Sequence, residues 1–105
     1  MRNVLLLAAA VAMIPLCVFA ADTTITQSHT TFDVDAVTVK AGDNVIFANK
    51  DDVTHNVQII NADGDIDDKG LQKPGQDIKA SFAAAGVYKI RCAIHPKMKM
   101  VVTVQ

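Results

Sequence analysis

Apolar and polar residues alternate along most of the chain after residue 21, in short runs separated by turn-forming residues. This pattern favours strands, and helical periodicity is hard to find in the same region. The alternation changes phase near Ala36, which predicts a bend or a bulge within the first run. Residues 61–75 contain Asp, Gly and Pro and are expected to form the longest loop. The expected strands cover residues 31–39, 45–48, 55–59, 77–82, 87–92 and 100–104.

Short strands at regular spacing are typical of an antiparallel sandwich or barrel. The expected fold is therefore all-β, a Greek-key β-sandwich of about seven or eight short strands. Side chains alternate between the two faces of a strand, so Tyr88, Ile90 and Cys92 share one face. The same rule places His55 on the inward face at the start of its strand, together with Val57.

Residues 1–20 follow a different pattern. Residues 1–3 are a short basic start, residues 4–19 form an almost unbroken apolar run, and Ala20 is a small residue at the expected cleavage position. This order is that of a secretory signal peptide, which predicts a mature domain of residues 21–105. An uncleaved membrane anchor is the alternative, because the run approaches the length that spans a bilayer.

Cleavage after Ala20 would remove Cys17 and leave Cys92 as the one cysteine of the mature chain. No disulfide can then form within the chain, and a lone thiol in an oxidising compartment is a liability unless a metal or another group occupies it. The charge is nearly balanced, with 10 Lys and Arg against 11 acidic residues. No basic patch with aromatic residues indicates nucleic-acid binding.

The chemically informative segment is residues 88–98, YKIRCAIHPKM. It places the thiol of Cys92, the imidazole of His95 and the thioether of Met98 at the end of an inward-facing strand. Soft sulfur ligands with imidazole select copper over hard cations, and two His, one Cys and a distant axial Met form an electron-transfer copper site. His55 is the expected second imidazole, because it follows a polar loop and has inward parity.

These motifs resemble those of the cupredoxins, the family of type 1 (blue) copper proteins. The likeness covers nearly the whole mature chain and is strongest to the amicyanins, with plastocyanins and pseudoazurins as close relatives. Residues 37–47 resemble the strand, turn and strand that precede the first histidine in these proteins. The tripeptide HNV at residues 55–57 and the loop CAIHPKM at residues 92–98 match the family's ligand motifs in spacing.

The resemblance implies a ligand set of two imidazoles, one thiolate and one thioether around one copper ion: His55, Cys92, His95 and Met98. Asn56 would tie the loop of the first histidine to the loop of the cysteine through hydrogen bonds. His95 would be the ligand at the solvent edge through which the electron passes, within a small apolar patch that includes Pro96.

Two positions leave alternatives open. Met100 is the alternative axial ligand, because plastocyanins and pseudoazurins use a longer spacing between histidine and methionine. A match of the last strand without gaps favours Met98, which leaves Met100 to pack in the core. Ile94 stands where family members often have Pro, so it restores an N–H that we expect to donate to the Cys92 sulfur and to raise the reduction potential.

Other candidate sites are weaker. The acidic stretch that includes Asp63–Asp68 resembles an EF-hand loop, but Ile66 stands where that loop requires Gly and Gln72 where it requires a bidentate Glu. We expect a solvated loop there, with a docking role left open. Structural zinc is disfavoured because a Met is a poor zinc ligand. His29 lies outside the matching motifs and is expected to be structural or to face solvent.

The expected function is one-electron transfer between redox proteins, such as a dehydrogenase and a cytochrome, in a bacterial periplasm. The partners would bind transiently to a monomer, and Lys97 and Lys99 beside the ligand loop would steer an acidic partner. Copper delivery or storage without redox cycling is the alternative. We expect no enzymatic activity, because four protein ligands leave no open position for a substrate.

Overall fold

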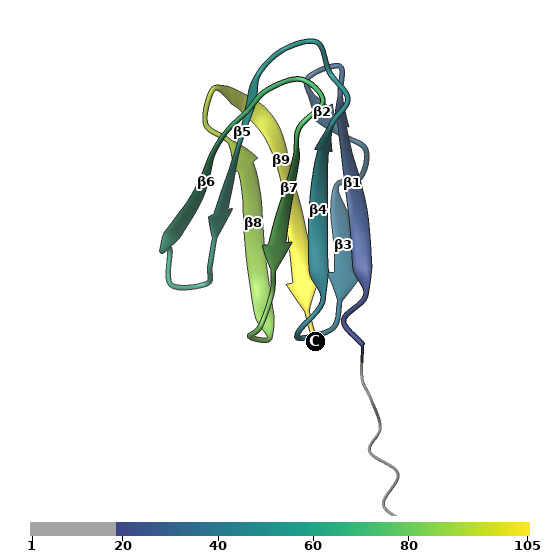
Figure 1. The fold of residues 1–105 in the computed structure, drawn as a ribbon. Helices are drawn as coiled ribbons and strands as arrows, with labels where there is room; N and C mark the ends of the chain where they lie inside the picture. The colour runs from purple at the N-terminus through teal and green to yellow at the C-terminus, as the bar shows by residue number, and fades with distance from the viewer. Residues whose placement is uncertain (1–18) are drawn as a thin grey trace, which may run out of the picture.

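Two β-sheets pack face to face in residues 19–105, the part of the chain that the computed structural model describes (Figure 1). The expected signal peptide lies almost wholly outside the described residues, so its cleavage stays a prediction. Residues 19–105 contain no helix long and apolar enough to cross a membrane.

The smaller sheet has the strand order β2-β1-β4-β7 and the larger sheet the order β3-β9-β8-β5-β6. The all-β Greek-key sandwich predicted from the sequence is confirmed. The described residues form nine strands, counting the two-residue β2, where about seven or eight were expected. The strands are β1 (Asp22–Ser28), β2 (Thr31–Phe32), β3 (Ala36–Val39), β4 (Asn44–Asn49), β5 (His55–Ile60), β6 (Ile66–Gln72), β7 (Asp77–Ser81), β8 (Gly86–Cys92) and β9 (His95–Val104).

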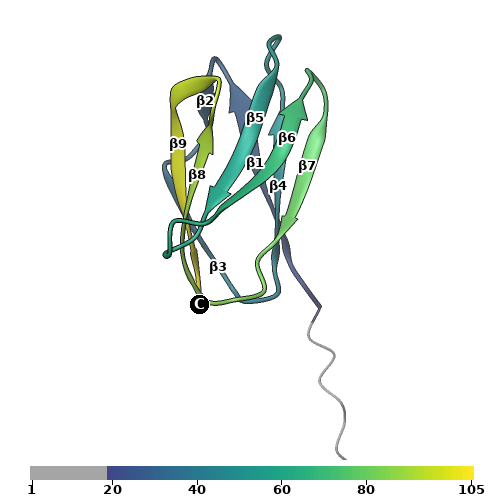
Figure 2. The same cartoon turned by 90° about the vertical axis from the view of Figure 1, so that its left-hand side faces the viewer.

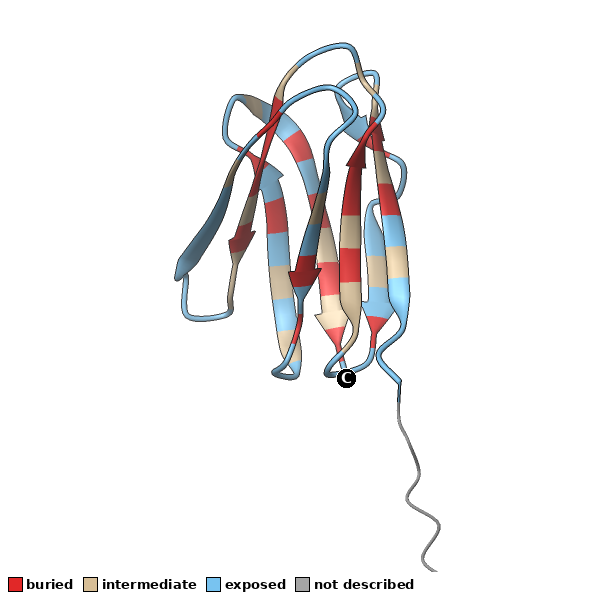
Figure 3. Cartoon of the chain, in the orientation of Figure 1, coloured by how far each residue is buried: buried red, intermediate tan, exposed pale blue. Residues whose placement is uncertain are grey.

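The core lies between the sheets, where buried residues alternate with less buried ones along parts of the strands (Figure 3). On β9 the buried positions run from Met98 through Met100 and Val102 to Val104. Tyr88 packs against this core, and its hydroxyl donates to the Ala84 carbonyl at 2.8 Å. Removal of these apolar surfaces from water is the main force that holds the two sheets together.

The strand pairing differs from the sequence prediction in two places. β1 pairs with β4 and β3 pairs with β9 in parallel, so the sandwich is mixed and not purely antiparallel. Both pairs arise because the chain leaves the smaller sheet after Phe32 and enters the larger sheet at Ala36. The phase change near Ala36 therefore marks a crossing between sheets, which is a larger change than the expected bend.

Two strands were not expected from the sequence. β6 lies within residues 61–75, which were predicted to be a loop, and it forms the edge of the larger sheet beside β5. Most of its residues are exposed, so it lacks the alternation of apolar and polar residues that marks a half-buried strand. β1 was likewise not predicted, because its sequence DTTITQS is mostly polar. Two of its residues, Ile25 and Gln27, are nevertheless buried.

One end of the sandwich gathers the start of β5, the end of β8 and the start of β9 (Figure 1). Residue 105 and the first strand's beginning lie at the opposite end, as the view turned by 90° also shows (Figure 2). The segments that contain the predicted ligands are thus neighbours in space, although His55 is far from the others in sequence.

Candidate metal centre

Three strand ends bring the predicted ligands together. His55 is the first residue of β5, Cys92 the last of β8 and His95 the first of β9. β5 and β8 are antiparallel neighbours with Gln58 opposite Arg91, so the start of β5 lies beside the end of β8. The turn after β8 returns the chain at once, and Cys92 pairs with His95 across it.

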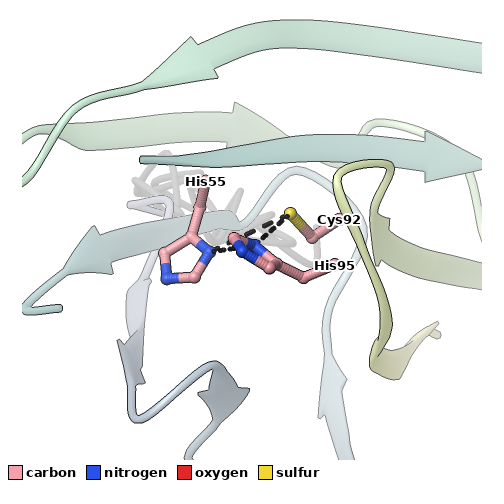
Figure 4. A group of neighbouring side chains, drawn as sticks. All are labelled: His55, Cys92 and His95. Carbon is pink, nitrogen blue, oxygen red and sulfur yellow. Dashed lines mark hydrogen bonds between the residues drawn. The ribbon is translucent and has the colours of Figure 1, made fainter. Parts of the chain in front are cut away.

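The three side chains point toward one another (Figure 4). Cys92 Sγ lies 3.6 Å from His95 Nδ1 and 3.9 Å from His55 Nδ1, and the two Nδ1 atoms are 3.1 Å apart. Metal bonds to imidazole nitrogen and thiolate sulfur are about 2.0–2.3 Å long, so one ion can reach all three atoms. Within residues 19–105 this is the one group of three or more candidate ligands whose donor atoms meet, all within 4.8 Å.

The donor set fits copper. A thiolate with two neutral imidazoles is a soft, mixed set that suits both Cu(I) and Cu(II). His55 and Cys92 are both 0% exposed, whereas His95 is partly exposed. The site therefore has a closed inner side and one imidazole at the solvent edge.

Asp51, in the loop before β5, orients His55 from its far side. Oδ2 of Asp51 lies 3.0 Å from His55 Nε2. Because a carboxylate only accepts hydrogen bonds, Nε2 holds the proton and Nδ1 is left with a lone pair for a metal. The Thr30 N–H donates to the same carboxylate oxygen at 2.8 Å. This bond is the main reason that the pKa of Asp51 falls from 3.8 to about 2, so Asp51 is a fixed negative charge.

Asn56 joins the loop of His55 to the loop of Cys92. Its backbone N–H donates to Cys92 Sγ at 3.3 Å, and its side-chain oxygen accepts from the Ala93 N–H at 3.0 Å. Its side-chain amide donates to Asp68 Oδ1 at 2.9 Å and to the Gly70 carbonyl at 3.1 Å. Asn56 thus lies where the sequence analysis expected a connecting residue.

The two methionines that compete for the axial position are both buried, Met98 at 2% and Met100 at 3% exposure. Their side chains have the same parity on β9, so parity does not separate them. The register does separate them, because Met100 lies opposite Ile90, whereas Met98 lies between the pairs Arg91–Lys99 and Cys92–His95. Met98 is therefore closer along the strand to the other three donors.

Ile94 lies in the turn between β8 and β9 and is 50% exposed. Across residues 19–105 the backbone donor recorded for Cys92 Sγ is the N–H of Asn56, not that of Ile94. Donation from Ile94 thus stays a prediction. Pro96 is exposed next to His95, in agreement with an apolar rim at the solvent edge.

Asp51, Thr30 and Asp68 were missed by the sequence analysis. The spacing of four residues between Asp51 and His55 matches no known sequence motif. Thr30 and Asp68 are distant from the ligands in sequence and come close to the site only because the chain folds. The acidic loop of Asp63–Asp68 has no convergent carboxylates of the kind that calcium requires. Instead the Asn61 side chain accepts from the N–H groups of two loop residues and closes the turn between β5 and β6.

A β-sandwich with a thiolate and two imidazoles between the loops at one end defines a small metalloprotein with a copper-type donor set. The comparison with known proteins agrees. The chain belongs to the copper binding proteins of the plastocyanin/azurin family, whose family model matches residues 19–105. The resemblance to the cupredoxins is thereby confirmed, and copper is the cofactor that the family and the donor set indicate.

Two curated relatives are similar in sequence. Methylamine utilization protein MauL of Methylorubrum extorquens is 29% identical over 76 residues, which cover 72% of this chain and 67% of the relative. The chloroplastic plastocyanin of Tetradesmus obliquus is 35% identical over 78 residues, which cover 67% of this chain. That alignment spans 54% of the plastocyanin's own length.

Two solved structures are similar in fold. Amicyanin from Paracoccus versutus has a TM-score of 0.74 at 26% identity, over 85% of this chain and 86% of its own. A purple cupredoxin from Nitrosopumilus maritimus has a TM-score of 0.69 at 25% identity, over 80% of this chain and 100% of its own.

Proposed function

We propose that this protein is a one-electron carrier whose type 1 copper ion is held by His55, Cys92, His95 and, as axial ligand, Met98. The main support is the convergence of three donor atoms from three strand ends. The register of β9 supports Met98 over Met100 for the axial position. Copper in such a site supplies one electron at a time and shuttles between Cu(II) and Cu(I).

The surrounding residues keep the ligands in one arrangement. Asp51 fixes the ring and the tautomer of His55, and Asn56 holds the loop after Cys92 at a set distance. Since these contacts are made by the protein alone, the ligands have little need to move when the charge of the site changes. A site that moves little pays a small reorganisation energy, which favours fast electron transfer.

The proposal extends to an exported carrier that works in a bacterial periplasm. The pattern of residues 1–20 supports export. A dehydrogenase as electron donor and a cytochrome as acceptor are the proposed partners, in line with the likeness to a methylamine utilization protein. The partly exposed His95, with Ile94 and Pro96 exposed beside it, is the proposed place of transient contact.

The test is to add Cu(II) to purified residues 21–105 and to record the visible spectrum and a voltammogram. We expect strong absorption near ~600 nm from charge transfer between thiolate and copper, and a reversible one-electron wave. Cys92→Ser and His55→Gln should abolish the band. His29→Gln is the matched control, because His29 is exposed and outside the site.

Three results would contradict the proposal. A colourless protein, or a colour that survives Cys92→Ser, would show that the ligand assignment is wrong. A coloured protein without a reversible wave would instead favour copper delivery or storage.

A further inference from the structure

The outer face of the β8–β9 hairpin is strongly basic. Four cationic side chains project from it, and all four are exposed. The two strands are neighbours in the larger sheet (Figure 1). We call this surface the basic face, and it consists of Lys89 and Arg91 on β8 and Lys97 and Lys99 on β9.

The cations are close together and are not neutralised. Arg91 lies directly opposite Lys99 in the register, and Lys89, opposite Val101, is the diagonal neighbour of Lys99. Like charges in directly opposite positions destabilise a sheet. Among residues 19–105 the recorded ion pairs involve Asp51, Asp67 and Asp22, and none includes a residue of the basic face.

The acidic residue that hydrogen bonds link to the basic face does not pair with it directly. Arg91 Nε donates to the neutral Gln58 Oε1 at 2.8 Å, and Gln58 in turn donates to Asp68 at 2.9 Å. Asp68 thus contacts the basic face only through Gln58. The whole chain has a net charge of −1, so the basic face is a local concentration of positive charge and not a consequence of a basic protein.

A shallow groove of about 650 Å³ runs over the basic face. All four cations line it, together with apolar residues that include Ile60, Pro96 and Val101. Asp35 is the one acidic residue among the lining residues. A surface with apolar area surrounded by exposed cations suits a protein partner with an acidic rim.

The basic face adjoins the metal centre. Pro96 lines the groove and directly follows His95, and Arg91 directly precedes Cys92. A partner that binds here is therefore held beside the end of the sandwich that contains the donor atoms. The distance for electron transfer between the redox centre of the partner and the metal centre would then be short.

We propose that the basic face is the docking surface for a redox protein with an acidic surface. This inference rests on the proposed function, since it names the kind of partner that exchanges electrons with the same site. The charges raise the rate of encounter and orient the partner with its redox centre toward His95. Release remains fast, because rim charges act on association more than on dissociation.

The binding test uses the copper(I)-loaded, 15N-labelled protein, titrated with poly-L-glutamate as an acidic probe. We expect amide shifts on β8 and β9 around the basic face, and their loss at high salt. Lys89→Gln/Lys99→Gln should weaken binding by about threefold or more at low salt. Lys40→Gln/Lys79→Gln removes the same charge from exposed residues outside the face and should change it much less.

The electron-transfer test uses stopped-flow oxidation of the reduced protein by hexacyanoferrate(III), an anion, and by tris(phenanthroline)cobalt(III), a cation. Lys89→Gln/Lys99→Gln should slow the reaction with the anion and speed the reaction with the cation at low salt. The control variant, Lys40→Gln/Lys79→Gln, should change the two rates in the same directions but by a much smaller factor.

Equal effects of the two double variants, or shifts that map away from β8 and β9, would overturn the docking proposal. Stronger binding to vesicles of phosphatidylglycerol than to poly-L-glutamate would overturn it in favour of a membrane surface. Failure of the proposed function is distinguishable, because it appears as the absence of a copper band. The titration with poly-L-glutamate is then done on the metal-free protein and still decides whether the face binds acidic polypeptides.

Discussion

Asp68 anchors a chain of hydrogen bonds that ends at the cysteine of the metal centre. It accepts from the side chains of Gln58 and Asn56 and from the N–H of Gly70. These bonds, led by that from Gln58, lower the pKa of Asp68 from 3.8. Asn56 links Asp68 to the metal centre, because its backbone N–H donates to Cys92 Sγ and its side-chain oxygen accepts from the Ala93 N–H.

We predict that Asp68→Asn destabilises the metal-free protein at pH 7 and that the difference from the wild type shrinks on acidification. The new amide side chain at position 68 would point an NH2 donor at groups that are themselves donors, since Asn56, Gln58 and Gly70 all donate to this position. The depressed pKa means that ionised Asp68 contributes stability that is fully present above its unfolded pKa of 3.8, and this contribution is lost as the pH falls from there through the lower pKa of the folded state. Urea unfolding of the wild type and of Asp68→Asn, at pH 7 and at pH 3, measures the stability difference at each pH. A difference that stays constant with pH would show that Asp68 acts by packing alone.

The two buried methionines of β9 give a second prediction at this scale. Met98→Leu should raise the reduction potential of the copper-loaded protein, since loss of a thioether that favours Cu(II) leaves Cu(I) relatively more stable. Met100→Leu should leave the potential nearly unchanged and cost less than about 1.5 kcal/mol of stability, because it conserves volume in the core. Spectroelectrochemical titration measures the potentials. A larger shift in the Met100 variant would reverse the axial assignment.

The sequence was enough to predict three donor residues that converge and the connecting residue Asn56, but not the carboxylates that hold His55 and Asn56. Cys92 and His95 lie in one short loop, and strand parity alone turns His55 inward, so local patterns placed all three. Asp51 and Asp68 reach their partners through side chains whose positions depend on loops and on pairing between distant strands. The alternation of apolar and polar residues within one strand gives no information about such contacts.

At the scale of elements, the turn between β1 and β2 contains the two non-glycine residues of the described chain that have positive φ. His29 and Thr30 have φ angles of 52° and 59°, in the left-handed region, which His tolerates but a β-branched residue such as Thr avoids. A two-residue hairpin of this kind normally has Asn-Gly. The same turn places the Thr30 N–H against Asp51, so the strained backbone supports the contact that orients His55.

We predict that Thr30→Gly stabilises the protein by about 1 kcal/mol, because relief of strain exceeds the entropy cost of glycine. The N–H that donates to Asp51 is kept, so the copper spectrum should not change. Thermal unfolding is the measurement, with a rise of about 4–8 °C expected for a domain of this size. Thr31→Gly is the control, because Thr31 has no positive φ and its hydroxyl donates to the Ser28 carbonyl, so it should destabilise. Equal losses in both variants would mean that the turn holds no strain.

The elements that sequence reasoning missed share a physical cause. β6 is an exposed edge strand, so burial imposes no alternation on its residues. β1 has Thr at positions where an apolar strand would show Val or Ile, and its inward Gln27 masks the period. The strands of the interior, β8 and β9, were predicted because both have a regularly buried face.

At the scale of the whole molecule, metal binding and folding are coupled. The donor atoms come from β5, β8 and β9, so an unfolded chain has no such site. We predict that copper at about 100 times its dissociation constant adds about 2.7 kcal/mol to the free energy of unfolding. The melting temperature should rise by about 10 °C or more. Calorimetry of the metal-free and copper-loaded forms measures the rise, and Cys92→Ser should abolish it. An equal rise in that variant would place the stabilising copper elsewhere.

The place of β9 as the last strand in the sequence sets the order in which the metal centre can be assembled. β9 lies between β3 and β8 and contains His95 and Met98, whereas His55 is synthesised much earlier. Until β9 leaves the ribosome, the nascent chain has only one of the two proposed imidazole ligands, His55, and no complete set of donors. Pairing between residues so far apart is also slow to form. With the proposed ligand set, a chain still under synthesis offers copper no complete site, and the metal would be acquired only after the polypeptide has been completed as far as β9.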